Sequence, residues 1–195
     1  MKHKKTLIVV SDDKIGHRLA ARLQGRNDCI VALDRTTGVA RVVKLLRRGR
    51  LKFRDVLKMW WAEQGRKDTP FRFDISLETL DDFKKHVCDR SYDKVILFRC
   101  GVVVSAAILE KAGPIFNIHC ASLPKYGGLS VIPRALRDQA WDQEACYYKI
   151  DERIDEGTVL RSKPYRLSPD QPYRLNEDIA YEAGMDVMMM VLDAS

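Results

Sequence analysis

The stretch "KVILFRCGVVVSAAILEKAGPIFNIH", residues 94–119, contains the pattern that predicts the fold. Lys94–Phe98 is an apolar run typical of a buried strand, and Ser105–Lys111 has helical character that ends at Gly113-Pro114. A second apolar run, Ile115–Ile118, indicates another strand. Strands that alternate with helices in this way favour an α/β fold with a mostly parallel sheet.

The same alternation extends in both directions along the chain. Further strands are expected at Thr6–Val10, Cys29–Leu33, Cys146–Ile150 and Thr158–Lys163, and further helices at Lys14–Leu23, Thr79–Cys88, Ile132–Arg137 and Asn176–Leu192. The linker between the last two strands is short, so we expect them to pair antiparallel. Asn176 is interpreted as the N-cap of the final helix.

These elements predict one Rossmann-like domain over residues 1–195. It is an α/β fold with a doubly wound, mostly parallel sheet and an antiparallel strand pair near its C-terminal end. A chain of 195 residues with 46% hydrophobic and 31% charged residues can form a core of this kind and is not disordered.

Several classes of protein are excluded by composition. No apolar run approaches the ~20 residues of a membrane span, and the short run Thr6–Val10 is followed by Asp12 and Asp13, which is not typical of a signal peptide. The five cysteines form no C-x-x-C pair, so neither a zinc signature nor a disulfide framework is indicated. We expect a cytoplasmic protein with free thiols, without a metal and without a membrane partner.

The chain is basic, with a formal net charge of +7, which favours an acidic partner. Residues 41–58 carry eight cations and a single acid, Asp55, and their apolar residues recur at helical spacing with a break at Gly49. This pattern predicts two amphipathic helices with a basic face. Such a face is either solvated, as charge runs usually are, or binds an anion. Repulsion between the nearby like charges weakens the first reading and leaves the two evenly matched.

The strand expected at Ile115–Ile118 contains and precedes side chains that could take part in a reaction. Asn117 and His119 lie two residues apart, so they share one face of the strand, and a loop rich in glycine and proline follows them. Asp155 lies in a turn before Gly157, between two expected strands. An amide, an imidazole and a carboxylate in one pocket suit acyl transfer to an amine. Alternatively, Asn117 and His119 are buried polar groups that satisfy loop backbone.

Two motifs together give a resemblance. "FNIHCASLPKYGG", residues 116–128, followed by "ERIDEG", residues 152–157, resembles the formyltransferases that use 10-formyltetrahydrofolate. That family typically shows N-x-H, an S-L-L-P-like loop and a D-x-G turn. It includes glycinamide ribonucleotide formyltransferase, methionyl-tRNA formyltransferase and the formyltransferases of nucleotide-linked amino sugars. The resemblance is clearest over residues 93–163.

The resemblance implies roles for individual residues. It implies Asn117, His119 and Asp155 as the catalytic residues. 10-Formyltetrahydrofolate is the implied co-substrate, with no metal. The implied contacts to this co-substrate are Gly101, Val102, Val104, Ala121, Ser122, Leu123, Pro124, Asp151 and Ile154. Val102 and Val104 can equally be read as core residues.

The chain also departs from the family pattern. Ala121-Ser122 replaces the usual Ser-Leu, Arg99 stands where small or apolar residues are usual, and Cys146 replaces a threonine or serine. The turn "VVSDDKIG" after the first strand lacks the Gly-rich, phosphate-cradling sequence of the glycinamide ribonucleotide enzymes. Residue 195 also falls before the C-terminal domain of the tRNA enzymes.

By elimination, the expected acceptor is a small primary amine, phosphorylated or nucleotide-linked, such as a nucleotide-linked amino sugar. Arg47, Arg48 and Lys125 are the candidate acceptor-binding residues. The alternatives are formyl transfer to glycinamide ribonucleotide or methionyl-tRNA, hydrolysis of formyl-folate, and a non-catalytic protein on the same fold that binds anions or nucleic acid through residues 41–58.

Overall fold

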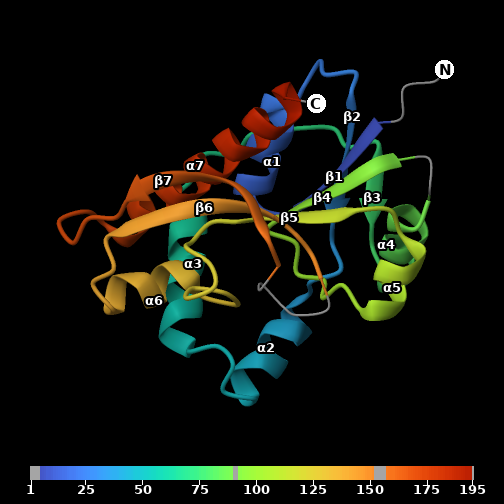
Figure 1. The fold of residues 1–195 in the computed structure, drawn as a ribbon. Helices are drawn as coiled ribbons and strands as arrows, with labels where there is room; N and C mark the ends of the chain where they lie inside the picture. The colour runs from blue at the N-terminus through green and yellow to red at the C-terminus, as the bar shows by residue number, and fades with distance from the viewer. Residues whose placement is uncertain (1–4, 90–91, 152–156, 195) are drawn as a thin grey trace.

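The computed structural model describes residues 5–89, 92–151 and 157–194. Within them, a seven-stranded sheet has helices on both faces (Figure 1). The strands are β1 (Lys5–Ser11), β2 (Cys29–Asp34), β3 (Ile75–Leu77), β4 (Tyr92–Phe98), β5 (Ile115–His119), β6 (Asp142–Lys149) and β7 (Val159–Arg166). The helices are α1 (Lys14–Arg22), α2 (Val39–Arg47), α3 (Phe53–Gln64), α4 (Leu80–Val87), α5 (Ala106–Lys111), α6 (Val131–Arg137) and α7 (Tyr173–Asp193).

The strand order is β3-β2-β1-β4-β5-β6-β7. The first five strands in this order pair parallel, and β5-β6 and β6-β7 pair antiparallel. This confirms the predicted fold class. β3 was not predicted, because it has only three residues and pairs with β2 alone. β6 begins at Asp142, four residues before the predicted start at Cys146.

Strand alternation divides the core into two layers. Ile8, Ile96 and Ile118 belong to the layer beneath α1 and α7, and the neighbouring positions Leu7 and Val95 belong to the layer beneath α4 and α5. β5 follows the same rule. Its residue Ile115 packs in the second layer, so Asn117 and His119, two and four residues later, face that side of the sheet.

The predicted pair of helices in the basic segment is confirmed. α2 and α3 are separated by a turn in which Gly49 has φ +65°, a left-handed conformation that glycine adopts without strain. α2 has no buried residue, and Figure 1 shows it standing away from the sheet. In the described residues, no helix is long and apolar enough to cross a membrane.

The prediction that Asn176 caps α7 is wrong. The helix begins three residues earlier, after Pro172, and Asn176 is 1% exposed within its first turn. Its Oδ1 accepts from the Ser168 backbone N–H at 2.8 Å, and its Nδ2 donates to the carbonyls of Ser168 (2.9 Å) and Gln171 (3.2 Å). The carboxamide therefore ties the β7–α7 connection to the helix, and this is a tertiary role that local sequence does not reveal.

This geometry predicts that Asn176→Asp is destabilising. A carboxylate serves well at an N-cap, but at this position it would replace two N–H donors and face two carbonyl oxygens. We expect both Asn176→Asp and Asn176→Ala to lower the free energy of unfolding by about 2–4 kcal/mol, since each leaves buried groups unpaired. Urea denaturation measures this. An Asp variant as stable as the wild type would contradict the assignment.

Candidate active site

β5 holds Asn117 between two other strands. It pairs parallel with β4 and antiparallel with β6, which places Asn117 opposite Tyr148. The Asn117 Nδ2 donates a hydrogen bond of 3.0 Å to the Tyr148 hydroxyl oxygen, and Tyr148 is buried. The carboxamide is therefore oriented by a phenol that the sequence analysis did not single out.

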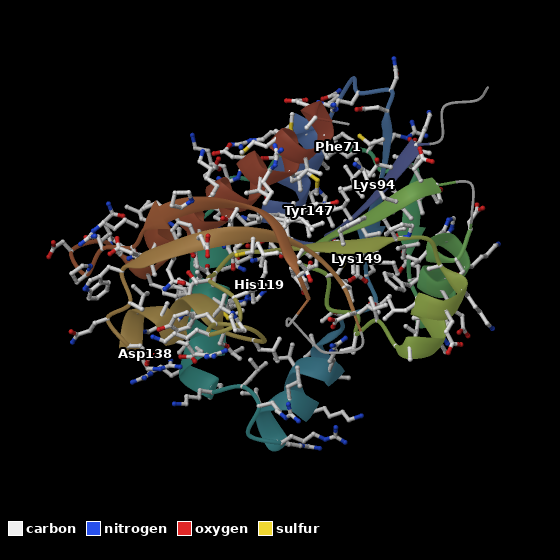
Figure 2. The ribbon with its side chains drawn as sticks, viewed as in Figure 1. Phe71, Lys94, His119, Asp138, Tyr147 and Lys149 are labelled. Carbon is white, nitrogen blue, oxygen red and sulfur yellow. The ribbon has the colours of Figure 1, made fainter. Side chains whose placement is uncertain are left out.

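His119 lies at the end of β5, where the sheet meets the following loop (Figure 2). It is buried, and its Nε2 lies 2.7 Å from the carbonyl oxygen of Tyr126. Because a carbonyl only accepts, this contact assigns the proton to Nε2. The imidazole is thereby held in one orientation by the loop that begins directly after it.

That loop is itself anchored by side chains. Ser122 accepts from the Glu144 backbone N–H through Oγ and donates its own backbone N–H to Gln143. Arg134 donates to the carbonyls of Lys125 and Gly127. Such anchoring keeps the backbone around His119 in one arrangement, as a preorganised site requires.

The residues predicted to contact folate differ in their burial and in the contacts they already make. Ala121 is buried in the core layer beneath α7, so a ligand could meet only its backbone. Gly101 donates its backbone N–H to Asp34 at 3.2 Å and lies so close to Thr37 that a side chain would collide with it. Val102 and Val104 are half-buried and pack against the layer beneath α4 and α5, which agrees with the core reading. Leu123 and Pro124 belong to the loop after β5.

Other predicted residues are placed apart or not described. Asp155 and Ile154 lie outside the described residues, and Asp151, just before them, is half-buried. Lys125 joins the His119 loop, with its ammonium 5.3 Å from the centre of the Tyr126 ring.

Arg47 and Arg48, at the end of α2, are exposed. Neither arginine belongs to β5 or to the loop that holds His119. Their assignment to an acceptor therefore stays a prediction.

An ion pair joins the segments that follow β1 and β4, where the sheet order reverses. The Arg99 Nη2 donates to the Asp13 carboxylate at 2.8 Å, and its guanidinium lies 4.0 Å from the centre of the Tyr181 ring. Arg99 has φ +61°, which is uncommon for a non-glycine residue. Open α/β sheets usually bind ligands at such a position. Here the chain's own side chains occupy it.

Carboxylates of the chain also occupy the N-terminus of α1. Asp13 accepts from the Gly16 backbone N–H at 2.8 Å, and Glu63 of α3 accepts from the Lys14 backbone N–H at 2.7 Å. Helix N-termini attract anions because their N–H groups are unpaired. In this protein two of those groups already have carboxylate partners.

The same region continues into a buried polar network. Arg66 donates to Glu177 at 2.8 Å and to Asp178 at 2.7 Å, and Tyr181 donates to Glu177 at 3.1 Å. Sequence analysis noted Asp13 and Arg99 as departures from the family pattern but did not connect them. They are 86 residues apart, so no local pattern could pair them.

The charge pair predicts a specific acid sensitivity. Burial alone would raise the pKa of Asp13, but the Arg99 guanidinium and hydrogen bonds from Gly16 and Ser11 hold it below its usual value. Asp13 therefore contributes stability that is present above the unfolded-state pKa of about 3.9 and is lost as pH falls through the lower folded-state pKa.

We expect Asp13→Asn to cost about 1–3 kcal/mol at pH 7, less than a fully buried pair would, because the Asp13 and Arg99 side chains are each 20% exposed, and to flatten the loss of stability below pH ~4. Chemical denaturation at several pH values measures both effects. Asp12→Asn is the control, since Asp12 is a more exposed carboxylate that pairs with Arg35 at the surface. Equal pH profiles for wild type and Asp13→Asn would contradict the role of the pair.

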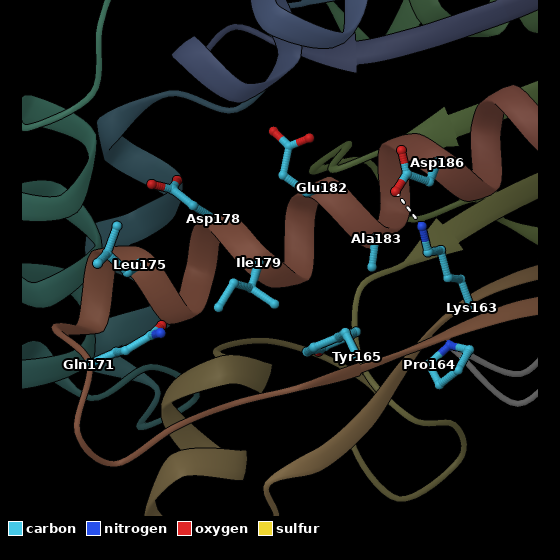
Figure 3. A pocket seen from close by; sticks show the side chains of 10 residues that line it. All are labelled: Lys163, Pro164, Tyr165, Gln171, Leu175, Asp178, Ile179, Glu182, Ala183 and Asp186. Carbon is cyan, nitrogen blue, oxygen red and sulfur yellow. Dashed lines mark hydrogen bonds and ion pairs between the residues drawn. The ribbon is translucent and has the colours of Figure 1, made fainter.

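A groove of about 500 Å³ lies elsewhere, between β7 and α7 (Figure 3). Its acids are already paired: Lys163 donates to Asp186 at 2.6 Å, Asp178 binds Arg66, and Glu182 pairs with Arg18. None of its lining residues belongs to the predicted site. We assign it no role.

Known proteins resemble this chain at two levels. Segments of 78 to 97 residues of this chain align with methionyl-tRNA formyltransferases. The protein from Campylobacter jejuni strain 81116 is 32% identical over 78 residues, which is 40% of this chain and 25% of that protein. The protein from Orientia tsutsugamushi is 27% identical over 94 residues, or 48% of this chain and 30% of that protein. The chain thus aligns with about a quarter to a third of the length of these curated relatives.

Solved structures share the fold. A sugar N-formyltransferase from Shewanella superposes with a TM-score of 0.64 at 15% identity, over 97% of this chain and 69% of that chain. Phosphoribosylglycinamide formyltransferase from Streptococcus pneumoniae gives a TM-score of 0.63 at 17% identity, over 97% and 98% of the two chains.

The family model for formyl transferases matches residues 46–191, a span that includes Asn117, His119 and the loop that follows them. The resemblance found in the sequence is therefore confirmed, and this chain belongs to the formyl transferase family.

Proposed function

We propose that this chain acts as a single catalytic domain that transfers a formyl group from 10-formyltetrahydrofolate to a primary amine of a small acceptor. One observation carries the proposal: in a member of the formyl transferase family, Asn117 and His119 lie on the same face at the end of β5. Tyr148 orients the Asn117 carboxamide, and the Tyr126 carbonyl orients the His119 imidazole. The five free cysteines support a cytoplasmic location.

The chemistry requires stabilisation of a tetrahedral intermediate. The acceptor amine forms a bond to the formyl carbon, the carbonyl oxygen becomes an oxyanion, and the bond from carbon to the folate nitrogen then breaks. Asn117 has two N–H donors on Nδ2, and Tyr148 takes one of them. The other is suited to donate to the oxyanion.

Proton transfer completes the reaction. The proton lost by the attacking amine must reach the leaving folate nitrogen, and His119 with Asp155 is the proposed route. A positioned imidazole suits this role because one ring nitrogen can accept a proton while the other donates one. The bond from His119 Nε2 to the Tyr126 carbonyl would fix which ring nitrogen is presented.

The proposed folate site lies beside these residues. It comprises Gly101, Val102 and Val104, the loop Ala121–Pro124, and Asp151 with Ile154. Backbone groups would supply the polar contacts, since Ala121 has no polar side chain and the Ser122 hydroxyl is already bonded to Glu144. Apolar walls with a few polar groups are typical of small-molecule sites.

Turnover with 10-formyltetrahydrofolate and candidate amines tests this proposal. We expect Asn117→Ala to lower kcat by roughly 10²–10³-fold, the usual loss for one oxyanion donor. Tyr148→Phe should lower kcat by about tenfold while KM for folate changes little, because the Asn117 carboxamide loses the hydrogen bond that orients it but remains in the site. Tyr147→Phe, on the adjacent residue that packs in the opposite core layer, is the matched control.

Folate binding separates the alternatives. At 100 times its Kd, a bound folate raises the free energy of unfolding by about 2.7 kcal/mol, which thermal denaturation detects. Binding without turnover, or formate release without an acceptor, would favour the non-catalytic or hydrolytic alternatives respectively. No binding and no turnover would reject the proposal.

For the acceptor, we propose a nucleotide-linked amino sugar. The carboxylates of Asp13 and Glu63 at the N-terminus of α1 support this choice, because they disfavour an acceptor phosphate at that position. The diphosphate would instead meet Arg47 and Arg48, with Lys125 beside the His119 loop. Arginine suits this role, since its planar guanidinium can donate two parallel hydrogen bonds to phosphate.

Calorimetric titration with nucleoside diphosphates tests the assignment. We expect Arg47→Ala/Arg48→Ala to weaken binding by at least about tenfold, the loss typical of charge-assisted hydrogen bonds. Arg50→Ala/Lys52→Ala removes the same charge from the neighbouring turn and should have a smaller effect. Equal affinities in all three proteins would remove Arg47 and Arg48 from the acceptor site. If the protein formylates phosphoribosylglycinamide and not a nucleotide-linked amino sugar, the proposed acceptor is wrong.

A further inference from the structure

Helix α3 has its apolar side chains on the outside. Phe53, Leu57, Trp60 and Trp61 are 70%, 42%, 51% and 63% exposed, and their spacing of i, i+4, i+7 and i+8 places them on one helix face. We call these four residues the α3 stripe. An ordinary surface helix buries such a stripe, so its exposure calls for a partner.

The opposite face of α3 carries Asp55, the half-buried Met59 and Ala62. Asp55 is buried and accepts two hydrogen bonds from Arg137, at 2.8 and 2.9 Å, and Ala62 is buried as well. α3 thus contacts the domain through the Asp55–Arg137 ion pair, the Glu63 hydrogen bond from the Lys14 backbone N–H and small or half-buried side chains, and the four residues of the α3 stripe stay largely exposed. The helix cannot simply be rotated to bury the stripe, because Asp55 would then lose Arg137.

Cations lie beside the α3 stripe on the same helix and along the segment that precedes it. Arg54 and Lys58 lie next to it on the same helix and are exposed, and residues 41–58 contain six more cations. The one acid in that segment, Asp55, is neutralised by Arg137. Val39 and Val43 of α2 add exposed aliphatic surface. The α2–α3 hairpin, residues 39–64, therefore combines positive charge with exposed aromatic and aliphatic groups.

Charge and shape discriminate between possible occupants. A second copy of the chain would bring two strongly cationic surfaces together, which repulsion opposes. A nucleic acid would pair with the cations and stack on the aromatic rings, but it would leave the aliphatic Val39, Val43 and Leu57 without a partner. An anionic lipid surface satisfies both classes, because phosphates meet the cations and the apolar groups enter the acyl boundary.

We propose that the α2–α3 hairpin docks this protein peripherally on anionic membranes. The helices would lie in the plane of the interface, where tryptophan is favoured. At 12 residues, α3 is far too short to span a bilayer. The sequence expectation of no membrane partner rested on the absence of a spanning segment, and peripheral docking needs none. The proposal does not depend on formyl transfer.

Vesicle binding tests the proposal directly. Trp60 and Trp61 are two of the three tryptophans, so their fluorescence reports on the α3 stripe. With vesicles of phosphatidylcholine containing phosphatidylglycerol, we expect co-sedimentation and a blue-shifted emission, and partitioning at least about tenfold stronger than with phosphatidylcholine alone. Trp60→Ala/Trp61→Ala should weaken co-sedimentation by about tenfold or more.

Charge variants separate the electrostatic part. Arg54→Glu/Lys58→Glu should remove the preference for anionic vesicles. Lys85→Glu/Lys111→Glu makes the same change in net charge on exposed positions of α4 and α5 and should retain it. Leu160→Ala, an exposed apolar side chain on β7, is the control for the tryptophan variant.

Three outcomes would overturn the proposal. The first is no binding of the wild type to anionic vesicles. The second is equal binding in the hairpin variants and their controls. The third is binding of the hairpin to another occupant in place of vesicles: tight, salt-sensitive binding to a short RNA, or a dimer in sedimentation that Trp60→Ala/Trp61→Ala dissolves.

Discussion

The arrangement of the site depends on the position of β5 between a parallel and an antiparallel neighbour. Its residues Phe116 and Ile118 pack in the layer beneath α7, which leaves Asn117 and His119 on the opposite face. Pairing with β6 then sets Tyr148 directly across from Asn117. A register shift by one residue would exchange the two faces, so hydrophobic burial of β5 also specifies the chemical side chains.

A second constraint operates at the neighbouring strand ends. The residues that follow β1 and β4 are joined by the ion pair of Asp13 and Arg99. Partial burial makes an unpaired arginine costly, so each partner depends on the other and on the Tyr181 ring beside the guanidinium. The chain thereby uses for its own stability a position at which related folds have room for a ligand. This leaves the end of β5 as the better candidate for chemistry.

The periodic parts of the fold could be predicted from the sequence, because strand runs and helical spacing are local signals. N-x-H followed by a Gly/Pro loop likewise gave the candidate residues Asn117 and His119. Three features could not be predicted this way. β3 exists through pairing with β2, Asn176 bonds across the β7–α7 connection, and Arg99 meets Asp13 from 86 residues away. Each depends on contacts between distant segments, for which a single sequence contains no pattern.

The α2–α3 hairpin follows a different physical logic from the rest of the molecule. Fully burying a large apolar side chain stabilises a fold by about 1.5–3 kcal/mol, and the four residues of the α3 stripe, which are 42–70% exposed, gain only part of this. Polar contacts help to hold the helix: Asp55 pairs with Arg137, an ion pair whose desolvation cost offsets much of its attraction, and Glu63 accepts from the Lys14 backbone N–H. The apolar free energy that folding does not use remains available for association. A segment built in this way contributes more to binding than to the stability of the isolated domain, and its positive charge selects the sign of what it binds.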